Sequence, residues 1–372
     1  MRILFTGGGS GGHVFPIIAI IRALKTIAEE EHIAELELFY IGPDYLGADA
    51  FFEENVSIIP ITSGKFRRYF SLTNIIDFFK VPIGFLQALW NIFLIMPDIV
   101  FSKGGFGALP AVLAAIIFRI PLIIHESDAV PGKVNRFSAR FARRIGIAFA
   151  GAEEHFPKEK TARVGVPIRK RILGGKRELS KERFDIFSTL PVVVIMGASL
   201  GSQRINNAVL GVLKELTEEY EILHQTGKNN FEDVKGESNI ILEFGHKERY
   251  HPFGFLGEQD VRDFYQAANL IVSRAGASSI FEIASWGKPS ILIPLRHAAQ
   301  DHQRKNAYEY AATGGAAIIE EGNLSPHILL GEIDKLMRDP EKLKKMGESA
   351  QSFARMDSAE LISREILKLG IH

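Results

Sequence analysis

Short apolar runs alternate with glycine-rich turns and helical patterns along the whole chain. The run 3–5 predicts a buried strand, the stretch 7–12 a glycine loop, and 14–24, with isoleucines at helical spacing, a helix. Further apolar runs predict strands at 36–41, 98–102, 122–124, 145–149, 190–196, 221–224, 239–244, 270–272, 290–293 and 316–319. Because helical patterns lie between these strands, we expect an α/β fold with parallel sheets and right-handed crossovers.

The chain also repeats itself weakly. The segment 99–105 resembles 270–276, and each copy continues into a helix and then a Pro-led apolar strand. The first strand and glycine loop have a counterpart at 192–202. This repeat predicts two doubly wound halves whose glycine loops line a shared cleft, a natural site for two phosphate-bearing molecules. The regular pattern breaks between 157 and 171, and we expect the domain boundary there.

Composition narrows the class of protein. The 372 residues are enough for two domains, and 46% hydrophobic with 24% charged residues indicates a globular chain. A formal net charge of +0 argues against a nucleic-acid-binding protein. The absence of cysteine excludes disulfides, a thiolate nucleophile and a cysteine zinc site. Because a strand begins by residue 3, we expect no secretory signal, and a location in the cytosol or on the cytosolic face of a membrane.

The first glycine loop carries the main chemical signal. A strand, a glycine loop and a helix in succession direct free backbone N–H groups and the positive end of a helix dipole at an anion. His13 falls at the start of this helix and is expected to face the ligand. The alternative is a tight turn with a helix-capping histidine. Gly7, Gly9 and Gly12 also match the dinucleotide fingerprint, but Asp44 comes too late after the second strand to hold a ribose, which disfavours a dinucleotide oxidoreductase.

Two further features lie at strand ends in the first half. A second glycine loop occupies 103–107, and the strand 122–124 delivers His125–Asp128 at its C-terminal end. In open α/β sheets, ligands bind at that edge. A histidine and two acids there favour a functional site over a structural one.

The stretch 65–98 is unusually apolar and aromatic. Basic residues flank it at Lys65, Arg67, Arg68 and Lys80, and 81–96 contains no charge. This uncharged run is shorter than the roughly 20 residues that span a bilayer, so it suits an interfacial anchor on anionic lipid. The alternative is an ordinary crossover helix packed on the sheet, and both can hold. The basic, aromatic segment 136–144 is either a second membrane contact or a solvated face.

The second half offers groups that suit a sugar nucleotide. Ser279 and Glu282 match a capping box, or else Glu282 accepts hydrogen bonds from the two hydroxyls of a ribose while loop N–H groups take a phosphate. The polar stretch 300–306 offers contacts for a sugar's hydroxyls, or else caps a helix. His297 and His302 are wrongly spaced to share one helical face as metal ligands, and no acidic pair resembles a divalent-metal site.

Together these residues resemble the MurG family, the peripheral-membrane N-acetylglucosaminyltransferases of bacterial peptidoglycan synthesis. The resemblance covers nearly the whole chain in order, through the motifs at Gly7–Pro16, Lys103–Phe106, His125–Asp128, Gly165–Arg169, Gly197–Asn206, His224–Lys228 and Arg274–Glu282.

The resemblance implies a GT-B glycosyltransferase with two Rossmann-like doubly wound parallel-sheet domains and an interdomain cleft. It implies an acceptor and membrane-associating domain at 1–162, a UDP-sugar donor domain at 163–355, and a helix at 356–372 that crosses back to the first domain. Such an enzyme moves N-acetylglucosamine from UDP-N-acetylglucosamine (UDP-GlcNAc) to the 4-hydroxyl of the muramyl sugar of undecaprenyl-diphosphate-linked lipid I, giving lipid II, with inversion and without an obligatory cofactor or metal. It works at the cytoplasmic face of the cell membrane.

Carried over by position, the resemblance implies two sets of ligand contacts. The donor set is Ser10, Gly11, Gly12, Arg169, Ser199, Phe255, Leu256, Ala277, Ser278, Glu282, His302 and Gln303. The acceptor-diphosphate set is Gly8, Gly9, Gly12, Gly104, Gly105 and Asn135. Two positions depart from the family pattern: Ser127–Asp128 stands where many relatives have an amide, and His302 where others have glutamine.

For catalysis we expect His13 as general base, because a helix N-terminus disfavours the imidazolium and keeps the imidazole able to take a proton. Glu126 and Asp128 are the rival bases, or they orient the acceptor. The alternative functions are another UDP-sugar-dependent lipid glycosyltransferase, a UDP-GlcNAc 2-epimerase, or a sensor that binds the donor without releasing UDP.

Overall fold

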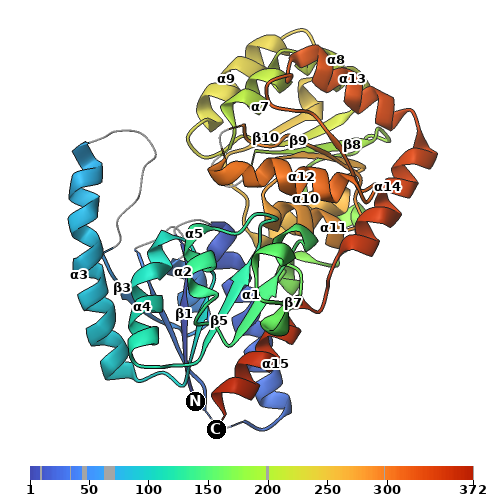
Figure 1. Cartoon of the computed structure of the whole chain (residues 1–372). Coiled ribbons are helices and arrows are strands. Elements are labelled where there is room, and N and C mark those ends of the chain that lie inside the picture. Colours follow the sequence, from blue (N-terminus) through green and yellow to red (C-terminus); the bar gives the residue numbers. More distant parts are fainter. Residues whose placement is uncertain are drawn as a thin grey trace. The chain divides into compact units, whose positions relative to one another are not determined.

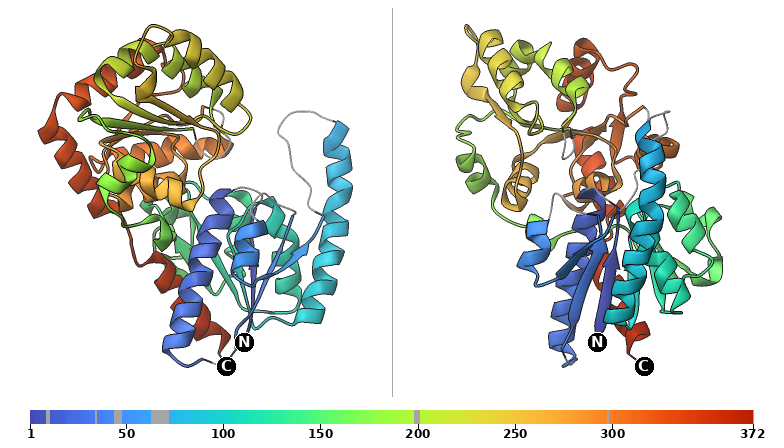
Figure 2. Two further views of the ribbon diagram at one scale, coloured as in Figure 1. Left: turned by 180° about the vertical axis from the view of Figure 1, so that it is seen from behind. Right: turned by 90° about the vertical axis from the view of Figure 1, so that its left-hand side faces the viewer.

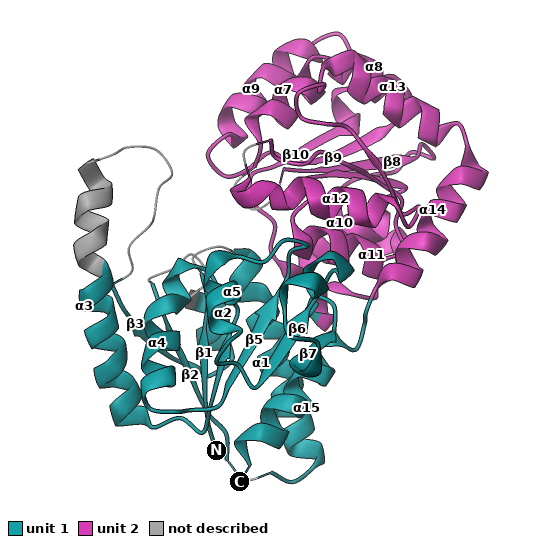
Figure 3. Ribbon diagram, viewed as in Figure 1, with its two compact units in different colours: residues 1–169, 355–372 teal, residues 170–354 magenta. Residues whose placement is uncertain are grey.

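The computed structural model describes residues 1–8, 11–33, 35–43, 48–62, 72–197, 201–296 and 298–371, without the side chains of residues 48 and 72–80. The chain forms two compact units (Figure 3). Unit 1 comprises Met1–Arg169 and Arg355–His372, and unit 2 comprises Lys170–Ala354. Each unit is built on its own parallel sheet, as the repeat predicts.

The sheet of unit 1 has the order β3-β2-β1-β4-β5-β6-β7, with every pair parallel (Figure 1). Its strands are β1 (Arg2–Thr6), β2 (Glu37–Gly42), β3 (Ser57–Pro60), β4 (Ile99–Ser102), β5 (Leu122–Glu126), β6 (Arg144–Ile147) and β7 (Thr161–Arg163). The chain winds outward from β1 through β2 to β3 and then returns to place β4 on the other side of β1. The C-terminal ends of β1 and β4 therefore form the switch point at which such sheets bind ligands.

Helices cover both faces of this sheet (Figures 1 and 2). They are α1 (Gly11–Glu30), α2 (Ala48–Glu53), α3 (Leu72–Ile95), α4 (Leu109–Ile117), α5 (Lys133–Ser138) and α15 (Ser358–Gly370). Side chains alternate along β1, so Ile3 and Phe5 pack with α1 and α15, whereas Leu4 packs with α3 and α4. Each face of the sheet thus has its own apolar core.

Unit 2 repeats this plan with the order β10-β9-β8-β11-β12-β13, again all parallel. Its strands are β8 (Val192–Met196), β9 (Glu221–Gln225), β10 (Tyr250–Phe253), β11 (Leu270–Ser273), β12 (Ser290–Leu292) and β13 (Ala316–Ile318). Its helices are α6 (Arg177–Arg183), α7 (Gln203–Leu210), α8 (Leu213–Glu219), α9 (Phe231–Ile241), α10 (Glu258–Ala267), α11 (Ala277–Ser285), α12 (His302–Ala311), α13 (Pro326–Met337) and α14 (Pro340–Phe353). The switch point lies between β8 and β11, the strands that the internal repeat matches to β1 and β4.

The prediction of a strand at 239–244 is wrong. This run lies at the end of α9 and in the turn after it; Leu242 is buried, whereas Ile240 and Phe244 are exposed. The strand on the far side of β9 is instead β10, which is only moderately apolar and contains Pro252. Proline is tolerated there because β10 is an edge strand, where one row of backbone groups needs no partner.

The first unit extends beyond the boundary expected at 162. Residues 163–169 belong to it, and helix α15 packs against α1, where Ser363 Oγ donates a hydrogen bond to the Ile20 carbonyl oxygen (3.1 Å). Gly165 has a φ of +79°, and a Cβ there would lie 2.7 Å from Arg355 Cβ. A glycine is therefore needed where the returning chain crosses the end of β7.

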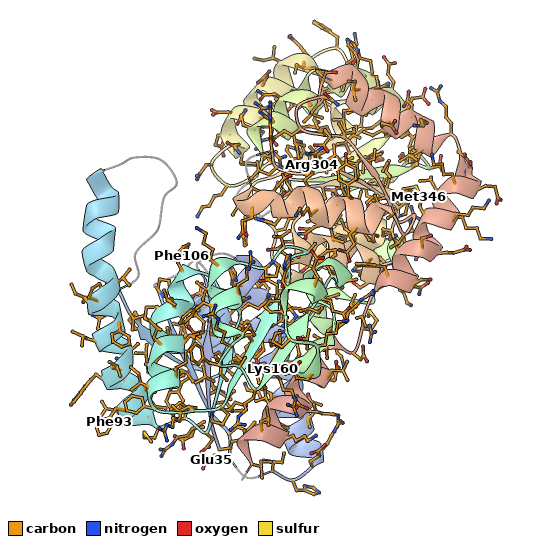
Figure 4. The ribbon with its side chains drawn as sticks, in the orientation of Figure 1. Glu35, Phe93, Phe106, Lys160, Arg304 and Met346 are labelled. Atoms are coloured by element: carbon orange, nitrogen blue, oxygen red, sulfur yellow. The ribbon has the colours of Figure 1, made fainter. Side chains whose placement is uncertain are left out.

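Helix α3 has two different faces. Gly84, Ala88 and Ile92, spaced four residues apart, are buried, and a Cβ on Gly84 would lie 1.9 Å from the Thr62 carbonyl oxygen. The opposite face exposes the large apolar side chains of Ile83, Leu86, Trp90, Phe93 and Leu94. Figure 4 labels Phe93 near the C-terminal end of this helix. The helix is thus a packed crossover helix that also carries an exposed apolar face.

Within the described part of the chain, one helix, α1, is long and apolar enough to cross a membrane by length and composition. Most of its apolar side chains, from Val14 to Ile27, are buried in the core of unit 1. It therefore serves as a core helix of the sheet.

Candidate active site

The two glycine loops of unit 1 touch each other at the switch point. A Cβ on Gly105 would lie 2.7 Å from the Gly8 Cα, and Gly105 has a φ of +83°. Only glycine fits at both positions, because a side chain on either would force the loops apart. The loop after β1 and the loop after β4 therefore form one continuous backbone surface. Gly9 and Ser10, two of the predicted ligand contacts, lie outside the described residues.

His13 lies against this surface. It sits in the first turn of α1, and a Cβ on Gly8 would lie 2.9 Å from its Nε2. A Cβ on Gly105 would lie 3.5 Å from the His13 Cε1. The fold thus brings His13, Gly8 and Gly105 together. Gly11 and Gly12 open the same helix, so the predicted anion-binding loop and the predicted base share one helix N-terminus.

Glu126 at the end of β5 is buried and its carboxylate is fully engaged. It accepts hydrogen bonds from the backbone N–H groups of Asp128 (3.0 Å) and Gly132 (2.9 Å) and from Asn135 Nδ2 (2.9 Å). Burial, and then the charge of Asp128, raises the pKa of this carboxyl group. These hydrogen bonds hold the segment from Glu126 to Asn135 in its turn conformation. The side chain of Asp128, by contrast, is partly exposed. Of the two acids, Asp128 is the one that can meet a ligand.

Asn135 lies next to the second glycine loop, with its amide oriented by its partners. Its Nδ2 donates to the His125 carbonyl oxygen (3.1 Å) and to Glu126, which commits the donor end. Its Oδ1 is buried, has no hydrogen-bond partner among the described residues, and would lie 2.6 Å from a Cβ on Gly104. An amide oxygen accepts hydrogen bonds, so this orientation suits a hydroxyl or N–H group better than the diphosphate that sequence reasoning assigned to Asn135.

Lys103 is a site residue that sequence reasoning missed. It follows β4 directly, its side chain is buried, and its ammonium group donates a hydrogen bond to Ser127 Oγ. Burial lowers its pKa to about 8, against the opposing charges of Glu126 and Asp128. The sequence signals were its place in the motif Lys103–Phe106 and its position directly after a buried strand.

Arg169 is the last residue of the first segment of unit 1, before the chain enters unit 2. Its guanidinium group stacks over the Phe15 ring of α1 at 4.0 Å from the centroid, and a Cβ on Gly11 would lie 3.1 Å from the same ring. Within its own unit, this predicted donor contact therefore adjoins the first glycine loop.

In unit 2, a buried arginine holds the loops of the switch point together. Arg274 follows β11, and its Nη2 donates to Ser202 Oγ (2.5 Å) and to Glu321 Oε1 (2.6 Å), while its Nη1 donates to the Ile293 carbonyl oxygen (3.2 Å). Ser202 in turn caps α7 by accepting from the Ile205 N–H. A single guanidinium group thus links the loops that follow β8, β11, β12 and β13. Ser199 lies outside the described residues.

The backbone N–H groups at the start of α11 are not used by a capping side chain. Gly276 is its N-cap residue, and no side chain caps it, so Ser279 and Glu282 do not form the capping box that their spacing allowed. Glu282 is instead partly exposed and accepts a hydrogen bond from the Tyr265 hydroxyl (3.2 Å). Ala277 and Ser278 form the first turn of the helix, where backbone N–H groups have no partner within the helix.

The remaining donor residues lie on two other loops of unit 2. Phe255 is 62% exposed, although it is a large apolar side chain, and Leu256 beside it is buried. His302 begins α12, where its Nδ1 is 2.6 Å from the Ala299 carbonyl oxygen, and Gln303 Oε1 accepts from the Leu295 N–H (3.0 Å). Before them, Gln300 and Asp301 both have a φ of +57°, a strained conformation that often marks a ligand-binding loop.

In the residues that the structure describes, no group of three or more histidine or acidic side chains could hold a metal ion. Separately, the groups described above that suit a diphosphate are backbone N–H groups, helix N-termini and the cations named.

Comparisons with known proteins agree with this arrangement. Residues 3–147 match the glycosyltransferase family 28 N-terminal domain, and residues 192–362 match the glycosyltransferase family 28 C-terminal domain. The chain is 36% identical over 345 residues to UDP-N-acetylglucosamine–N-acetylmuramyl-(pentapeptide) pyrophosphoryl-undecaprenol N-acetylglucosamine transferase 2 of Bacillus thuringiensis subsp. konkukian, covering 92% of this chain and 93% of that protein. It is 38% identical over 340 residues to the corresponding transferase of Shouchella clausii, covering 90% of each chain.

Solved structures show the same fold. Acinetobacter baumannii MurG superimposes with a TM-score of 0.73 at 24% identity, over 99% of both chains. A UDP-GlcNAc 2-epimerase from Neisseria meningitidis, bound to UDP-GlcNAc, reaches 0.70 at 14% identity, over 99% of this chain and 100% of that one. The prediction of two Rossmann-like, doubly wound parallel-sheet units of the GT-B class is confirmed. The chain belongs to the MurG family of glycosyltransferases, the UDP-N-acetylglucosamine–N-acetylmuramyl-(pentapeptide) pyrophosphoryl-undecaprenol N-acetylglucosamine transferases.

Proposed function

We propose that this enzyme moves N-acetylglucosamine from UDP-GlcNAc to the 4-hydroxyl of the muramyl sugar of lipid I, with inversion at the anomeric carbon. The products are lipid II for peptidoglycan synthesis and UDP. The observation that carries the proposal is identity of 36–38% over at least 90% of the chain to transferases named for this donor and acceptor. The reaction needs no redox group, and we propose that no metal or other cofactor is required.

We propose His13 as the general base. The acceptor hydroxyl must lose a proton as its oxygen attacks the anomeric carbon, while the bond to the UDP oxygen breaks. A neutral imidazole at the start of α1 is available for this, because the positive end of the helix dipole disfavours the charged form. Glu126 is a poorer base in this geometry, because its oxygens already accept three hydrogen bonds.

We propose that unit 2 holds the donor. The uncapped first turn of α11 suits a phosphate, and the partly exposed Glu282 suits the two hydroxyls of a ribose because a carboxylate accepts two hydrogen bonds. The exposed Phe255 ring offers a stacking surface for uracil. Arg274 takes part indirectly, by fixing the loops that carry these groups.

The test measures UDP release from UDP-GlcNAc with and without a lipid I analogue. We expect release only when the acceptor is present, together with a disaccharide product of inverted anomeric configuration by NMR. The runner-up function is a UDP-GlcNAc 2-epimerase, which is favoured by the fold likeness to such enzymes. Conversion of the donor sugar without any lipid would establish that alternative and refute the transferase.

We also propose that unit 1 docks peripherally on an anionic membrane at the cytoplasmic face. The exposed face of α3 presents Leu86, Trp90 and Phe93, whose contact with lipid removes apolar area from water. The exposed arginines Arg136 and Arg140 on and after α5 suit anionic headgroups. The basic flank 65–71 lies outside the described residues.

Cosedimentation with phosphatidylglycerol vesicles tests the docking surface. Trp90→Glu should lower vesicle binding at least about tenfold, because a charge replaces the largest exposed aromatic side chain of α3. The matched control is Phe244→Glu in unit 2, an 89% exposed aromatic residue that the proposal leaves in water, which should bind as the wild type does. Equal loss in both variants, or in neither, would refute this surface.

A further inference from the structure

Lys103 occupies the same place in unit 1 as Arg274 occupies in unit 2. Lys103 follows β4, which pairs with β1, and Arg274 follows β11, which pairs with β8. Each comes directly after the serine that ends its strand, Ser102 or Ser273. Both side chains are buried. Burying a cation costs several kcal/mol unless its charge is balanced, so each should have an acidic partner. For Arg274 that partner is Glu321, in a direct ion pair.

The counter-charges of Lys103 come from the turn after β5. The negative charges of Glu126 and Asp128 both favour the ammonium form of Lys103, and the charge of Glu126 has the larger effect. Ser127, between these two residues in the chain, accepts the hydrogen bond of the ammonium group. The other titratable neighbour, His125, is disfavoured as a cation by burial and by Lys103. One ammonium therefore sits against two carboxyl groups that would otherwise repel each other.

The Glu126 carboxylate already accepts three hydrogen bonds from its own turn and from Asn135, whereas the Asp128 side chain is partly exposed. We propose that Lys103 is a positioning residue of the acceptor site, which fixes the 126–128 turn through Ser127 and so holds the Asp128 side chain where it accepts hydrogen bonds from hydroxyl or amide N–H groups of the acceptor sugar. This inference rests on the proposed function of unit 1 as the acceptor site.

The loss of the ammonium group would affect the turn in two ways. Ser127 would lose its buried hydrogen-bond donor, and the neighbouring acids Glu126 and Asp128 would lose their counter-charge. Lys103 thus helps to hold the turn that presents the Asp128 side chain.

A double-mutant cycle on Lys103 and Asp128 tests the inference. UDP release is measured against acceptor concentration for wild type, Lys103→Met, Asp128→Asn and the double variant. We expect Lys103→Met to lower the acceptor kcat/KM about tenfold or more, mainly through KM, with the donor KM within about twofold of wild type. Since the amide needs no counter-charge, Lys103→Met should cost far less in the Asp128→Asn background, giving a coupling of about tenfold.

Lys103→Arg is the matched control, because it keeps the positive charge. Arg274 shows that an arginine side chain can be buried at the equivalent place in unit 2. It should retain acceptor kinetics within about threefold of wild type, which a purely steric role of lysine would not allow. Equal losses from Lys103→Met in both backgrounds, or a loss shared by the donor KM, would overturn the inference. A thermal melting curve that matches that of the wild type shows in every case that the variant, including unit 1, is folded.

A second readout does not depend on turnover. NMR of lysine labelled at Cε reports the ionisation of Lys103, whose pKa lies at about 8. Asp128→Asn should lower this pKa, because it removes one of the two carboxylates that favour the ammonium form. An unchanged value would overturn the pairing even if the enzyme is active. If the pairing is found but the wild type transfers no sugar, then the proposed function fails and the pairing stands.

Discussion

The switch points of the two sheets are built alike, but the buried cation at each one has a different set of partners. In unit 2 the cation after β11 is an arginine whose hydrogen bonds go to Ser202, Glu321 and the Ile293 carbonyl oxygen. In unit 1 the cation after β4 is a lysine that donates a hydrogen bond to Ser127 and lies near the charges of Glu126 and Asp128 and the imidazole of His125. The planar guanidinium locks four loops, whereas the ammonium acts mainly as a charge.

The difference agrees with the roles proposed for the two units. The proposed nucleotide site needs a fixed set of backbone N–H groups, and the hydrogen bonds of Arg274 fix the loops that carry them. The proposed acceptor site instead combines the imidazole of His13 with the side chains of Asp128 and Lys103. Variants in the two units test this assignment.

His13→Ala should lower kcat between about 10² and 10⁴-fold, because unit 1 loses its proposed base. The affinity for UDP, measured by calorimetry, should remain at the wild-type value, since the groups proposed to hold the uracil and the ribose, Phe255 and Glu282, lie in unit 2. Turnover close to that of the wild type, with donor binding intact, would place the base elsewhere and make Asp128 the next candidate.

Arg274→Met should destabilise the protein by about 3–5 kcal/mol, because Glu321 would keep a buried charge without its partner. The free energy of unfolding in urea measures this cost. The control is Arg338→Met, which breaks the exposed pair with Asp334 and should cost about 1 kcal/mol or less. Similar costs for both variants would show that the buried brace is not stabilising the loops.

Gly105→Ala and Gly201→Ala should separate the two sites. A Cβ on Gly105 would lie 2.7 Å from the Gly8 Cα, and one on Gly201 would lie 2.1 Å from the Thr226 carbonyl oxygen; both residues have a positive φ. The first variant should lose about 10²-fold in turnover with normal UDP affinity, and the second should lose UDP affinity.

The control for these two variants is Gly331→Ala in α13, where a Cβ would meet open space. It should leave both measurements unchanged. If Gly105→Ala weakened UDP binding as much as Gly201→Ala does, the assignment of separate roles to the two units would be wrong.

The smallest effect concerns pH. His224 at the end of β9 is buried, with its ring nitrogens beside the Tyr250 hydroxyl and Asn206 Oδ1, and burial lowers its pKa to about 3 from 6.5. Between these values the unfolded chain binds more protons than the folded one, so stability falls as the pH drops from 6.5 toward 3. The loss from this residue is about 1.4 kcal/mol at pH 5.5.

Unfolding of wild type and His224→Gln at pH 7 and pH 5.5 checks this contribution. The variant should lose less stability on acidification than the wild type does. An identical loss in both proteins would mean that His224 does not titrate between the two states. His125 in unit 1 is shifted in the same direction by burial and by Lys103, so part of the wild-type dependence should remain.

Local pattern predicted much of this molecule. The apolar runs at 3–5, 99–101 and 270–272 became central strands, because a strand buried on both faces must be apolar along its whole length. The pattern failed at 239–244, where the same kind of run ends a helix, since a short apolar run fits either structure. The strand at 250–253 was missed, because its histidine and proline interrupt the apolar pattern.

The amino-acid sequence alone was enough to identify the strand–glycine loop–helix units, the family and the candidate His13, since each depends on residues that are neighbours in the chain. The three-dimensional fold was needed to show that β4 lies beside β1, that the Glu126 carboxylate is bonded to its own turn, and that Lys103 and Arg274 are buried cations at equivalent places. The partners of these groups lie on other strands and turns, as Glu321 does for Arg274. Charge balance in a core depends on distances in space, which a local pattern of hydrophobic and polar residues does not encode.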